Sequence, residues 1–600
     1  MTSARKGLVR VFAALSSVLG LMLLSLSFVP YFSLKSVADR LAPDGELESF
    51  SPHVAQVLRV PWGVAGIALL LAAGWSILRP NAFLWLLSLS LRRCASWLRD
   101  FRQFVADLRL LSLSGTELAS LAVICGLGLV ARLMLVNRPI EYDEASTVMA
   151  FAHSPFRILV SDYHVPNNHI FHTILVRIVV LLLGSQPWQI RLPVLLAGML
   201  LILLVFWLGR TLYARDVGYL SAAIVAFLPH MVERSVSARG YVIVALLTVM
   251  AFLLASYLVR HRNLFAWSLL VVLCALGFYT VPVMLFPFGF LMLWMLMSTQ
   301  DVSKDQYTRS AWGLHLVAAV IVVVLLTLLL YSPILLSTGV RYLFPSSGVL
   351  HSQSLQSLLA GLPALASSVI AEWSGRLPPV WPGIFLFGMI LSLLTIRDRQ
   401  NHRVHTEVAF LPAVLILLSV QRPNTLSRIW LWVIPFAAIW VSAGLGILLK
   451  LIPRNRVGQG VHLVLLVGLV AGLAATGIQS SRQRLIDNDF EFPHGEDVAR
   501  FLAPRLNSRS LLVVHYGWDA TFWYDLYLQG VERSPIYSRQ RDRPFDEVFV
   551  PTVDTNCDGG DVLRTLLAVG PDLSRLNFDE MREVGQVDSV KICWIPSAHQ

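Results

Sequence analysis

The stretch Arg138-Pro-Ile-Glu-Tyr-Asp-Glu144 follows directly on an apolar segment that ends near Val136. It places three carboxylates, Glu141, Asp143 and Glu144, beside a predicted membrane span. A charged side chain at the centre of a bilayer costs about 2.5 to 3.5 kcal/mol. The cluster therefore lies in water or in a protein cavity. It is either the start of a solvated loop or an acid–base site at the membrane surface.

The composition around this stretch excludes a soluble protein. Of the 600 residues, 56% are hydrophobic and 14% are charged, whereas charged residues make up about a quarter of a globular chain. Apolar runs of about 16 to 23 residues recur over 1–480 and match the thickness of a bilayer. The net charge of +11 is no sign of nucleic acid, because the Lys and Arg residues stand between the runs. Contact with anionic membrane lipid explains them better.

The apolar runs predict an α-helical polytopic membrane protein with its N-terminus in the cytoplasm. Arg5, Lys6 and Arg10 precede the first run, which we interpret as a signal anchor. The last predicted span then leaves the polar tail outside. Thirteen spans are predicted, at about 11–31, 57–78, 116–136, 192–209, 217–231, 241–258, 264–279, 281–298, 312–332, 381–396, 407–420, 429–449 and 460–478.

Three segments are predicted to lie along the membrane surface. Residues 81–112 are basic with a short apolar part, which indicates cytoplasmic interfacial helices. The segment 170–184 is short and carries Arg177 in its middle, which favours a juxtamembrane helix on the outer face. Were it a span, every later loop would change sides and the excess of Lys and Arg in cytoplasmic loops would disappear. The segment 355–370 contains Gly361 and Pro363 and is predicted as a surface or re-entrant helix.

The chain divides into three predicted parts. Residues 1–112 hold an extra pair of spans and the interfacial helices, 113–480 form the main membrane domain, and 481–600 form a small extracytoplasmic α/β domain. Cys557 and Cys593 in this last domain are either a disulfide or two thiols. Its elements are predicted as strands at 511–515, 548–550 and 591–594 and as helices at 519–528 and 561–569.

The topology collects unusual polar residues at the outer surface. Carboxylates, histidines and arginines meet there. An arginine fork matches phosphate oxygens, and a carboxylate can accept the proton of an attacking hydroxyl. The set therefore indicates a site for an anionic, lipid-linked substrate. Its members are Glu141, Asp143, Glu144, residues 162–169 with His164 and His169, Glu233, Arg239, Arg341, Tyr342, Arg422 and Arg428.

The order of these motifs resembles the GT-C superfamily of membrane glycosyltransferases, in the branch with protein O-mannosyltransferases and the lipid A aminoarabinose transferase. The resemblance covers about 115–300 well and 400–450 loosely. Two extra spans precede the region of resemblance. The matching motifs are Asp143-Glu144, His164-Val-Pro166, Arg191-Leu-Pro-Val-Leu-Leu-Ala-Gly198, Leu208-Gly-Arg-Thr-Leu-Tyr-Ala-Arg215, Ser235-Val-Ser-Ala-Arg-Gly-Tyr241 and Tyr279-Thr280.

The resemblance implies an inverting hexosyl or pentosyl transferase. The lack of eukaryotic targeting signals and the compact loops predict a bacterial inner membrane. The donor of such a transferase would be a polyprenyl-phosphate sugar and its acceptor an extracytoplasmic lipid, glycan or protein. Asp143 would be the general base, with Glu144 beside it as catalytic or positioning partner. Where the family has a further acid this chain has Ser237, so Glu233 is the nearest candidate. The implied substrate-binding residues are His164, His169, Arg239, Arg428, Tyr279 and Glu233.

Each of these residues also has a plain structural interpretation. Asp143 would serve as a helix N-cap, and Glu141 as a solvated charge. Arg239 and Arg428 would reach the lipid headgroups. Arg341 is a weaker candidate than these two for a phosphate ligand. His164 and His169 would bind loop backbone. Tyr279 would belong to the aromatic belt.

No cofactor is predicted, and a divalent metal is an alternative that carboxylates beside histidine would allow. Two other classes of protein compete with the glycosyltransferase. A transporter or flippase of lipid-linked sugars would place its charges near the bilayer midplane. An O-antigen ligase or polymerase would use a large late loop, where Arg341, His351 and Arg376 stand.

Overall fold

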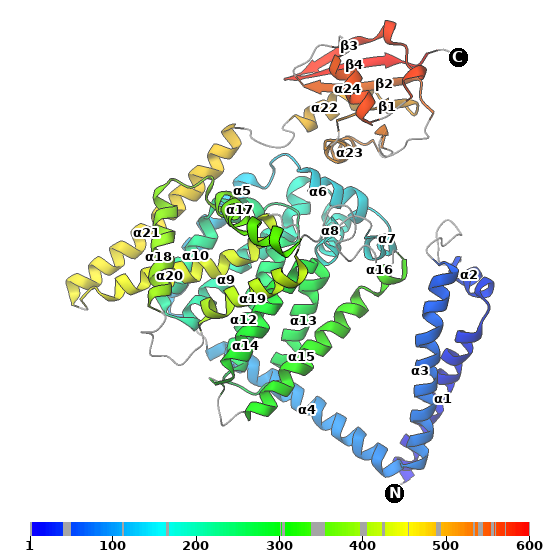
Figure 1. The fold of residues 1–600 in the computed structure, drawn as a ribbon, viewed down its shortest axis with the longest axis vertical. Helices are drawn as coiled ribbons and strands as arrows, with labels where there is room; N and C mark the ends of the chain where they lie inside the picture. Colours follow the sequence, from blue (N-terminus) through cyan, green and yellow to red (C-terminus); the bar gives the residue numbers. More distant parts are fainter. Residues whose placement is uncertain are drawn as a thin grey trace.

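The chain forms a helical body, an N-terminal helical hairpin and a small C-terminal domain above the body (Figure 1). The structure is a computed structural model. It describes all residues except 1–2, 40–49, 111–112, 164–166, 301, 303–306, 338–353, 396–404, 423–426, 454, 488–493, 516, 532–533, 538–543, 554–556, 558–559, 570–571 and 599–600.

Helices dominate the chain up to residue 487. They are α1 (Ser3–Phe28), α2 (Tyr31–Asp39), α3 (Pro52–Leu78), α4 (Pro80–Leu110), α5 (Gly115–Leu135), α6 (Tyr142–Thr147), the π-helix η1 (Val148–Ala152), α7 (Phe156–Ser161), α8 (Ile170–Leu183), α9 (Pro187–Leu212), α10 (Arg215–Phe227), α11 (Pro229–Arg234), α12 (Tyr241–Leu258), α13 (Leu264–Thr280), α14 (Leu285–Met297), α15 (Arg309–Leu330), α16 (Ser332–Ser337), α17 (Leu355–Ser374), α18 (Val380–Leu394), α19 (Thr406–Gln421), the 3-10 helix η5 (Ser427–Val433), α20 (Ile434–Lys450) and α21 (Arg456–Asp487).

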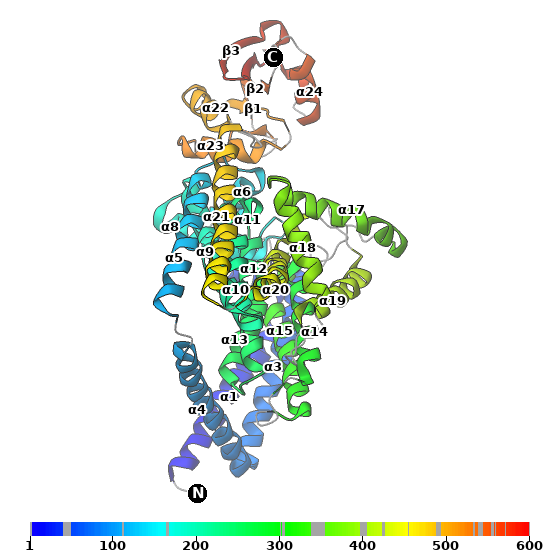
Figure 2. The ribbon, with the colours of Figure 1, turned by 90° about the vertical axis from the view of Figure 1, so that its left-hand side faces the viewer.

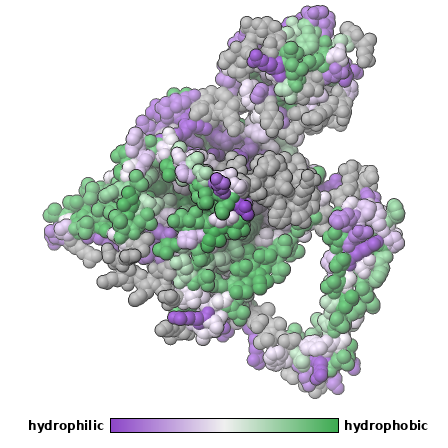
Figure 3. Space-filling view, in the orientation of Figure 1, coloured by the Kyte–Doolittle hydropathy of each residue, from purple (hydrophilic) through white to green (hydrophobic). Residues whose placement is uncertain are grey.

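The protein is a multi-pass membrane protein. Within the described residues, nine helices are long and apolar enough to cross a membrane. Eight of these helices coincide with predicted spans, and the remaining one is α17, which the sequence predicts as a surface or re-entrant helix. The other five predicted spans correspond to the shorter helices α10, α13, α14, α18 and α19. Figure 3 shows a hydrophobic band across the body and the hairpin, with hydrophilic residues above and below it.

The predicted span at 217–231 is wrong in one respect, because the helix breaks inside it. Helix α10 ends at Phe227 and the short helix α11 begins at Pro229. Proline disfavours helical backbone at the residue before it and lacks an N–H to continue the helix. The break turns the chain between α10 and α11, at the level of helix α17. Figure 2 shows α17 lying crosswise to α18 at this level.

The N-terminal hairpin stands beside the body and is joined to it by α4 (Figure 1). Helices α1 and α3 pack along their length. The predicted interfacial segment 81–112 is one continuous helix, α4, over its described part. The side chain of Asp107 accepts a hydrogen bond from Tyr257 at 2.7 Å, and the Asp100 carboxylate accepts one from the backbone of Leu264 at 2.7 Å. These bonds fix α4 beneath the turn between α12 and α13.

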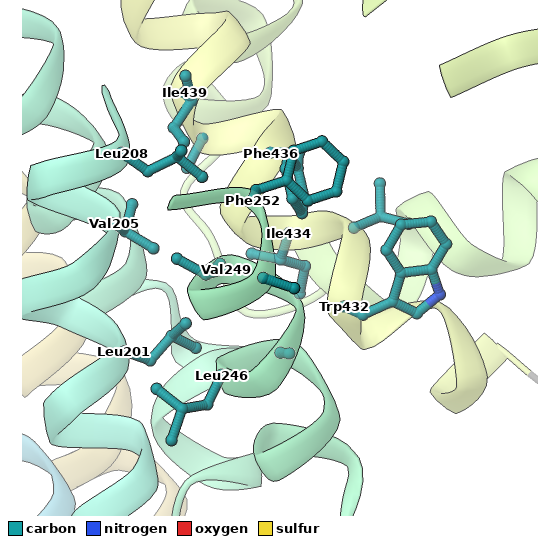
Figure 4. Packing of buried hydrophobic residues seen from close by; sticks show 14 of the residues in the cluster. Leu201, Val205, Leu208, Leu246, Val249, Phe252, Trp432, Ile434, Phe436 and Ile439 are labelled. Carbon is teal, nitrogen blue, oxygen red and sulfur yellow. The ribbon is translucent and has the colours of Figure 1, made fainter. Parts of the chain in front are cut away.

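The centre of the body is made by α9, α12 and α20. Leu201 and Val205 of α9, Val249 and Phe252 of α12 and Phe436 of α20 are all buried here (Figure 4). Lipid tails are as apolar as these side chains, so close van der Waals packing rather than escape from water holds such helices together.

Residues beyond α21 form a domain with a four-stranded sheet of order β1-β2-β4-β3. Strand β1 pairs parallel with β2, and the other pairs are antiparallel. A disulfide joins Cys557 and Cys593, the pair left open from the sequence. The elements are α22 (Gly495–Leu502), β1 (Ser510–Leu512), α23 (Asp519–Leu528), β2 (Glu547–Val553), α24 (Gly560–Val569), β3 (Arg582–Val587) and β4 (Val590–Pro596).

The predicted strands and helices of this domain are found, although β1 ends at Leu512, before the predicted end at 515, and α22 and β3 are additions. Strand β3 carries no apolar signal in the sequence. None of its residues is fully buried, since it lies at the edge of the sheet. Such a strand lacks the apolar run that marks a buried one. Helix α21 continues to Asp487, past the boundary predicted at 480, so the exact division of the chain stays a prediction.

Candidate active site

Asp143 lies in the first turn of the short helix α6, on the side of the body that carries the C-terminal domain (Figure 1). The N-cap position of α6 is Glu141 and not Asp143. The Asp143 side chain is 29% exposed. Its carboxylate is therefore free of a capping role and is directed toward two arginines from distant parts of the chain.

Glu144 anchors the helix that carries Asp143. Its carboxylate receives hydrogen bonds from Arg191 Nε at 3.0 Å and from Arg191 Nη2 at 2.7 Å, and both side chains are fully buried. The backbone N–H of Ala238 donates to the same carboxylate at 2.5 Å. The backbone N–H of Glu141 donates to it at 3.1 Å. Both oxygens are thus occupied, which suits a positioning role for Glu144.

The expectation that Glu141 is a solvated charge is wrong. Its side chain is 20% exposed and forms an ion pair and hydrogen bond with the buried Arg138. Burial raises the pKa of the Glu141 carboxyl, but the neighbouring Arg138 guanidinium outweighs it, so the net shift of the pKa is downward. Glu141 is therefore ionised and engaged in holding the loop before α6.

Two arginines meet at the Asp143 carboxylate. Arg428 Nη1, from η5, lies 2.6 Å from Asp143 Oδ2. Arg239 Nη2, from the turn before α12, lies 3.7 Å from the same oxygen. Arg239 is 6% exposed, which excludes the interpretation that it reaches out to lipid headgroups. The sequence prediction that Asp143 and Arg428 open onto the same side is confirmed.

His169 completes the cluster. Its Nδ1 accepts a hydrogen bond from the backbone N–H of Gly240 at 2.8 Å. Burial and the nearby Arg239 hold the pKa of His169 well below its ordinary value, so the ring is neutral and its proton is on Nε2. This nitrogen lies 3.3 Å from Arg239 Nη2. Two N–H donors therefore converge, an arrangement that an anionic oxygen between them would satisfy.

Asn167 and Gly240 fix the positions of these groups. Arg239 Nη1 donates to the backbone carbonyl of Asn167 at 3.0 Å, to its side-chain oxygen, and to Thr147 Oγ1 at 3.1 Å. A Cβ on Gly240 would lie 2.5 Å from Thr280 Cγ2 and 3.1 Å from His169 Nδ1. The close approach of the chain to His169 thus requires glycine at 240.

The C-terminal domain packs on the same helix. Ala520 and Tyr524 of α23 belong to one buried cluster with Ala145 of α6 and Met149 of η1. The hydroxyl of Tyr524 donates to the backbone carbonyl of Ser185 at 2.5 Å. The domain therefore contacts the helix that positions Asp143.

The remaining predicted site residues lie elsewhere. Tyr279 is buried in an apolar cluster with Tyr163 and Tyr331. Glu233 lies 3.3 Å from Arg376 Nε and 3.7 Å from Arg484 Nε, in a separate pocket. His164, Arg341, Tyr342 and His351 lie outside the described residues.

The described part of this cluster does not fit a divalent cation. In that part of the chain no group of three or more His, Cys, Asp or Glu side chains is gathered. The neighbours of Asp143 are guanidinium groups, whose positive charge repels a metal ion.

Sequence reasoning missed Arg191 and Arg138 as partners of the acidic stretch. In the sequence Arg191 stands out only as part of a motif, although an arginine at the start of an apolar segment indicates a buried acid as its partner. The acid is Glu144, 47 residues earlier in the chain.

Comparisons with known proteins bear on this arrangement. Residues 167–331 match the family model for dolichyl-phosphate-mannose-protein mannosyltransferase. A search of curated protein sequences finds no match.

Several solved structures are similar. The structure of apo ArnT from Cupriavidus metallidurans is similar at 15% identity with a TM-score of 0.52, over 80% of this chain and 98% of that one. ArnT bound to undecaprenyl phosphate gives 14% identity with the same coverage and TM-score. Archaeal oligosaccharyltransferase AglB from Archaeoglobus fulgidus gives 12% identity over 72% of this chain and 69% of that one, with a TM-score of 0.45.

The fold is that of a polytopic membrane protein with a small α/β domain at its C-terminus. The chain has the GT-C fold, and its resemblance to the GT-C superfamily of membrane glycosyltransferases is confirmed.

Proposed function

We propose that the protein transfers a sugar from a polyprenyl-phosphate donor to an extracytoplasmic acceptor, with Asp143 as the general base. The observation that carries the proposal is the meeting of Asp143 with Arg428, Arg239 and His169 at one place. A base and several donors to an anionic oxygen are the two needs of such a transfer. The GT-C fold and the match to the mannosyltransferase model support the same reaction.

The proposed step is a single displacement. An acceptor hydroxyl attacks C1 of the sugar from one face while the bond from C1 to the phosphate oxygen breaks on the other, so the configuration at C1 inverts. The acceptor proton passes to the Asp143 carboxylate. The leaving polyprenyl phosphate takes the electron pair of the broken bond, and Arg428, Arg239 and His169 Nε2–H would stabilise its charge.

The ion pair between Arg428 and Asp143 fits this scheme. The Arg428 side chain is 37% exposed, so it is not locked in a buried position and can turn toward a phosphate. Binding of the donor would then separate Arg428 from Asp143 and leave the carboxylate ready to accept a proton. A donor of this class accords with the undecaprenyl phosphate bound in one of the similar ArnT structures. We place the site and the C-terminal domain on the outer face of a bacterial inner membrane.

Mass spectrometry of envelope glycans, lipids and glycoproteins tests the proposal. Cells with and without the gene, complemented with the wild type or with Asp143→Asn, are compared. We expect one sugar substituent to disappear without the gene and to stay absent with the variant. Asp216→Asn is the matched control, because Asp216 is 35% exposed and also ion-paired, with His462. An unchanged profile with well-expressed Asp143→Asn would remove Asp143 from the reaction.

A further inference from the structure

A second polar pocket lies beside the candidate site, between α11, the end of α17 and α21. Helix α11 contacts both other helices, and Figure 2 shows the three below the C-terminal domain. The pocket has a volume of about 460 Å³, within the range of about 300 to 1,000 Å³ that small-molecule sites occupy. Its charged and aromatic lining residues are His230, Glu233, Arg234, Glu372, Trp373, Arg376 and Arg484.

Three of these lining residues are arginines and two are glutamates. Arg234 Nη2 lies 2.9 Å from Glu372 Oε1, and Arg376 Nε lies 3.3 Å from Glu233 Oε1. The lining thus carries one more positive than negative charge. Arginine forks bind carboxylate or phosphate in two-pronged fashion, so this lining suits a ligand with an anionic group.

Two neutral groups of the lining lack hydrogen-bond partners in the described structure. His230 is 6% exposed, and its Nε2 lies 3.7 Å from Glu372 Oε1, too far for a hydrogen bond, and makes no other hydrogen bond. The buried indole N–H of Trp373 has none either. Buried polar atoms are nearly always paired, so these two point to a ligand with uncharged polar atoms. Hydroxyl oxygens would serve, and the face of an indole ring packs well against a sugar ring.

The pocket adjoins the Asp143 cluster through η5. Helix α17, which carries Glu372 of the pocket, packs against η5. Arg428 of η5 contacts Asp143 at 2.6 Å. A ligand in the pocket therefore lies next to the proposed base and outside the arginine–histidine cluster that would hold the leaving phosphate.

We propose that this pocket binds the acceptor, and that the acceptor is a sugar carrying a carboxylate or phosphate group. The ligand's role as acceptor rests on the proposed function, whereas the class of ligand rests on the pocket alone. Arg376 would bind the anionic group together with Arg234. His230 and Trp373 would contact the hydroxyls and the ring.

Binding to the purified full-length protein, without donor, tests this assignment. Saturation-transfer NMR titrations would use glucuronic acid, glucose 6-phosphate, glucose and inorganic phosphate as probes. We expect both charged sugars to bind and glucose to bind at least about tenfold more weakly, as loss of charge-assisted hydrogen bonds implies. Arg376→Gln should weaken the charged sugars by about tenfold, and Arg376→Lys by less.

The matched control is Arg210→Gln. Arg210 is 33% exposed and 3.4 Å from Glu117, whereas Arg376 is 31% exposed and 3.3 Å from Glu233. This control should leave binding unchanged.

Four results would overturn the assignment. They are no saturable binding of a charged sugar, equal binding of glucose, inorganic phosphate binding as tightly as glucose 6-phosphate, and displacement of both charged sugars by phosphatidylglycerol in nanodiscs. The last two would mark a site for a bare anion or a lipid headgroup. Because no donor is present, such a failure leaves the proposed transfer standing. Absence of transfer with intact binding would overturn the proposed function and the role as acceptor, but not the class of ligand that the pocket binds.

Discussion

Removing Arg191 tests the claim that a buried ion pair holds the helix of Asp143. In the substitution Arg191→Met, five hydrogen bonds are lost, two to Glu144 and three to backbone carbonyls. Both side chains are fully buried, so the change leaves the Glu144 carboxylate desolvated without its main partner. Breaking a buried pair in this way costs about 3 to 5 kcal/mol.

The same substitution at a pair whose arginine is exposed sets the scale. Arg215 Nε lies 2.9 Å from Glu117, but Arg215 is 52% exposed. Arg215→Met should cost about 0 to 1 kcal/mol. The double variant Arg191→Met with Glu144→Gln removes the stranded charge as well, so its cost should fall short of the sum of the single costs by at least about 1 kcal/mol.

Equilibrium unfolding in mixed micelles, followed by tryptophan fluorescence, measures these free energies. Glycan analysis of the same variants shows whether activity falls with the order of α6. If Arg191→Met cost no more than Arg215→Met, or if the double variant were strictly additive, the ion pair would not be what positions Asp143.

Three further predictions concern other parts of the structure. Cys557→Ser should lower the free energy of unfolding of the C-terminal domain by about 2 to 4 kcal/mol, since it opens the bond to Cys593; a melting curve that is insensitive to reductant would contradict this. Gly240→Ala should lower sugar transfer at normal expression, because the new Cβ would come within 2.5 Å of a neighbouring side chain, whereas Gly361→Ala, with nothing within 4 Å, should behave as the wild type. Tyr524→Phe should loosen the C-terminal domain from α6 by about 1 kcal/mol, seen as faster hydrogen exchange in α6, and unchanged exchange would argue against docking through this hydroxyl.

Much of the fold could be predicted because the signals are local. Hydrophobic runs marked the long helices, and the placement of Lys and Arg put Asp143 and Arg428 on one side of the membrane. The structure brings these two residues within 2.6 Å. Helix α8 is short, with 14 residues, as expected for the juxtamembrane segment.

What could not be predicted depends on contacts between distant segments. The half-buried Glu141 carboxylate accepts a hydrogen bond from Ser237 of a later turn, 96 residues away. The docking of α23 on α6 joins segments more than 300 residues apart. The place of Glu233 in the chain predicts it at the site, but in the structure it lies 3.3 Å from Arg376 instead. Periodicity within one helix carries no information on such pairings.

The rate of polyprenyl-phosphate release tests the central claim most directly. The purified protein is supplied with the polyprenyl-phosphate sugars and acceptor-bearing envelope fraction of the producing cells, and release is followed for the wild type and for Asp143→Asn. The account predicts a rate about 100 to 10,000 times lower for the variant, the contribution of a general base. A variant that releases polyprenyl phosphate within threefold of the wild-type rate would contradict it.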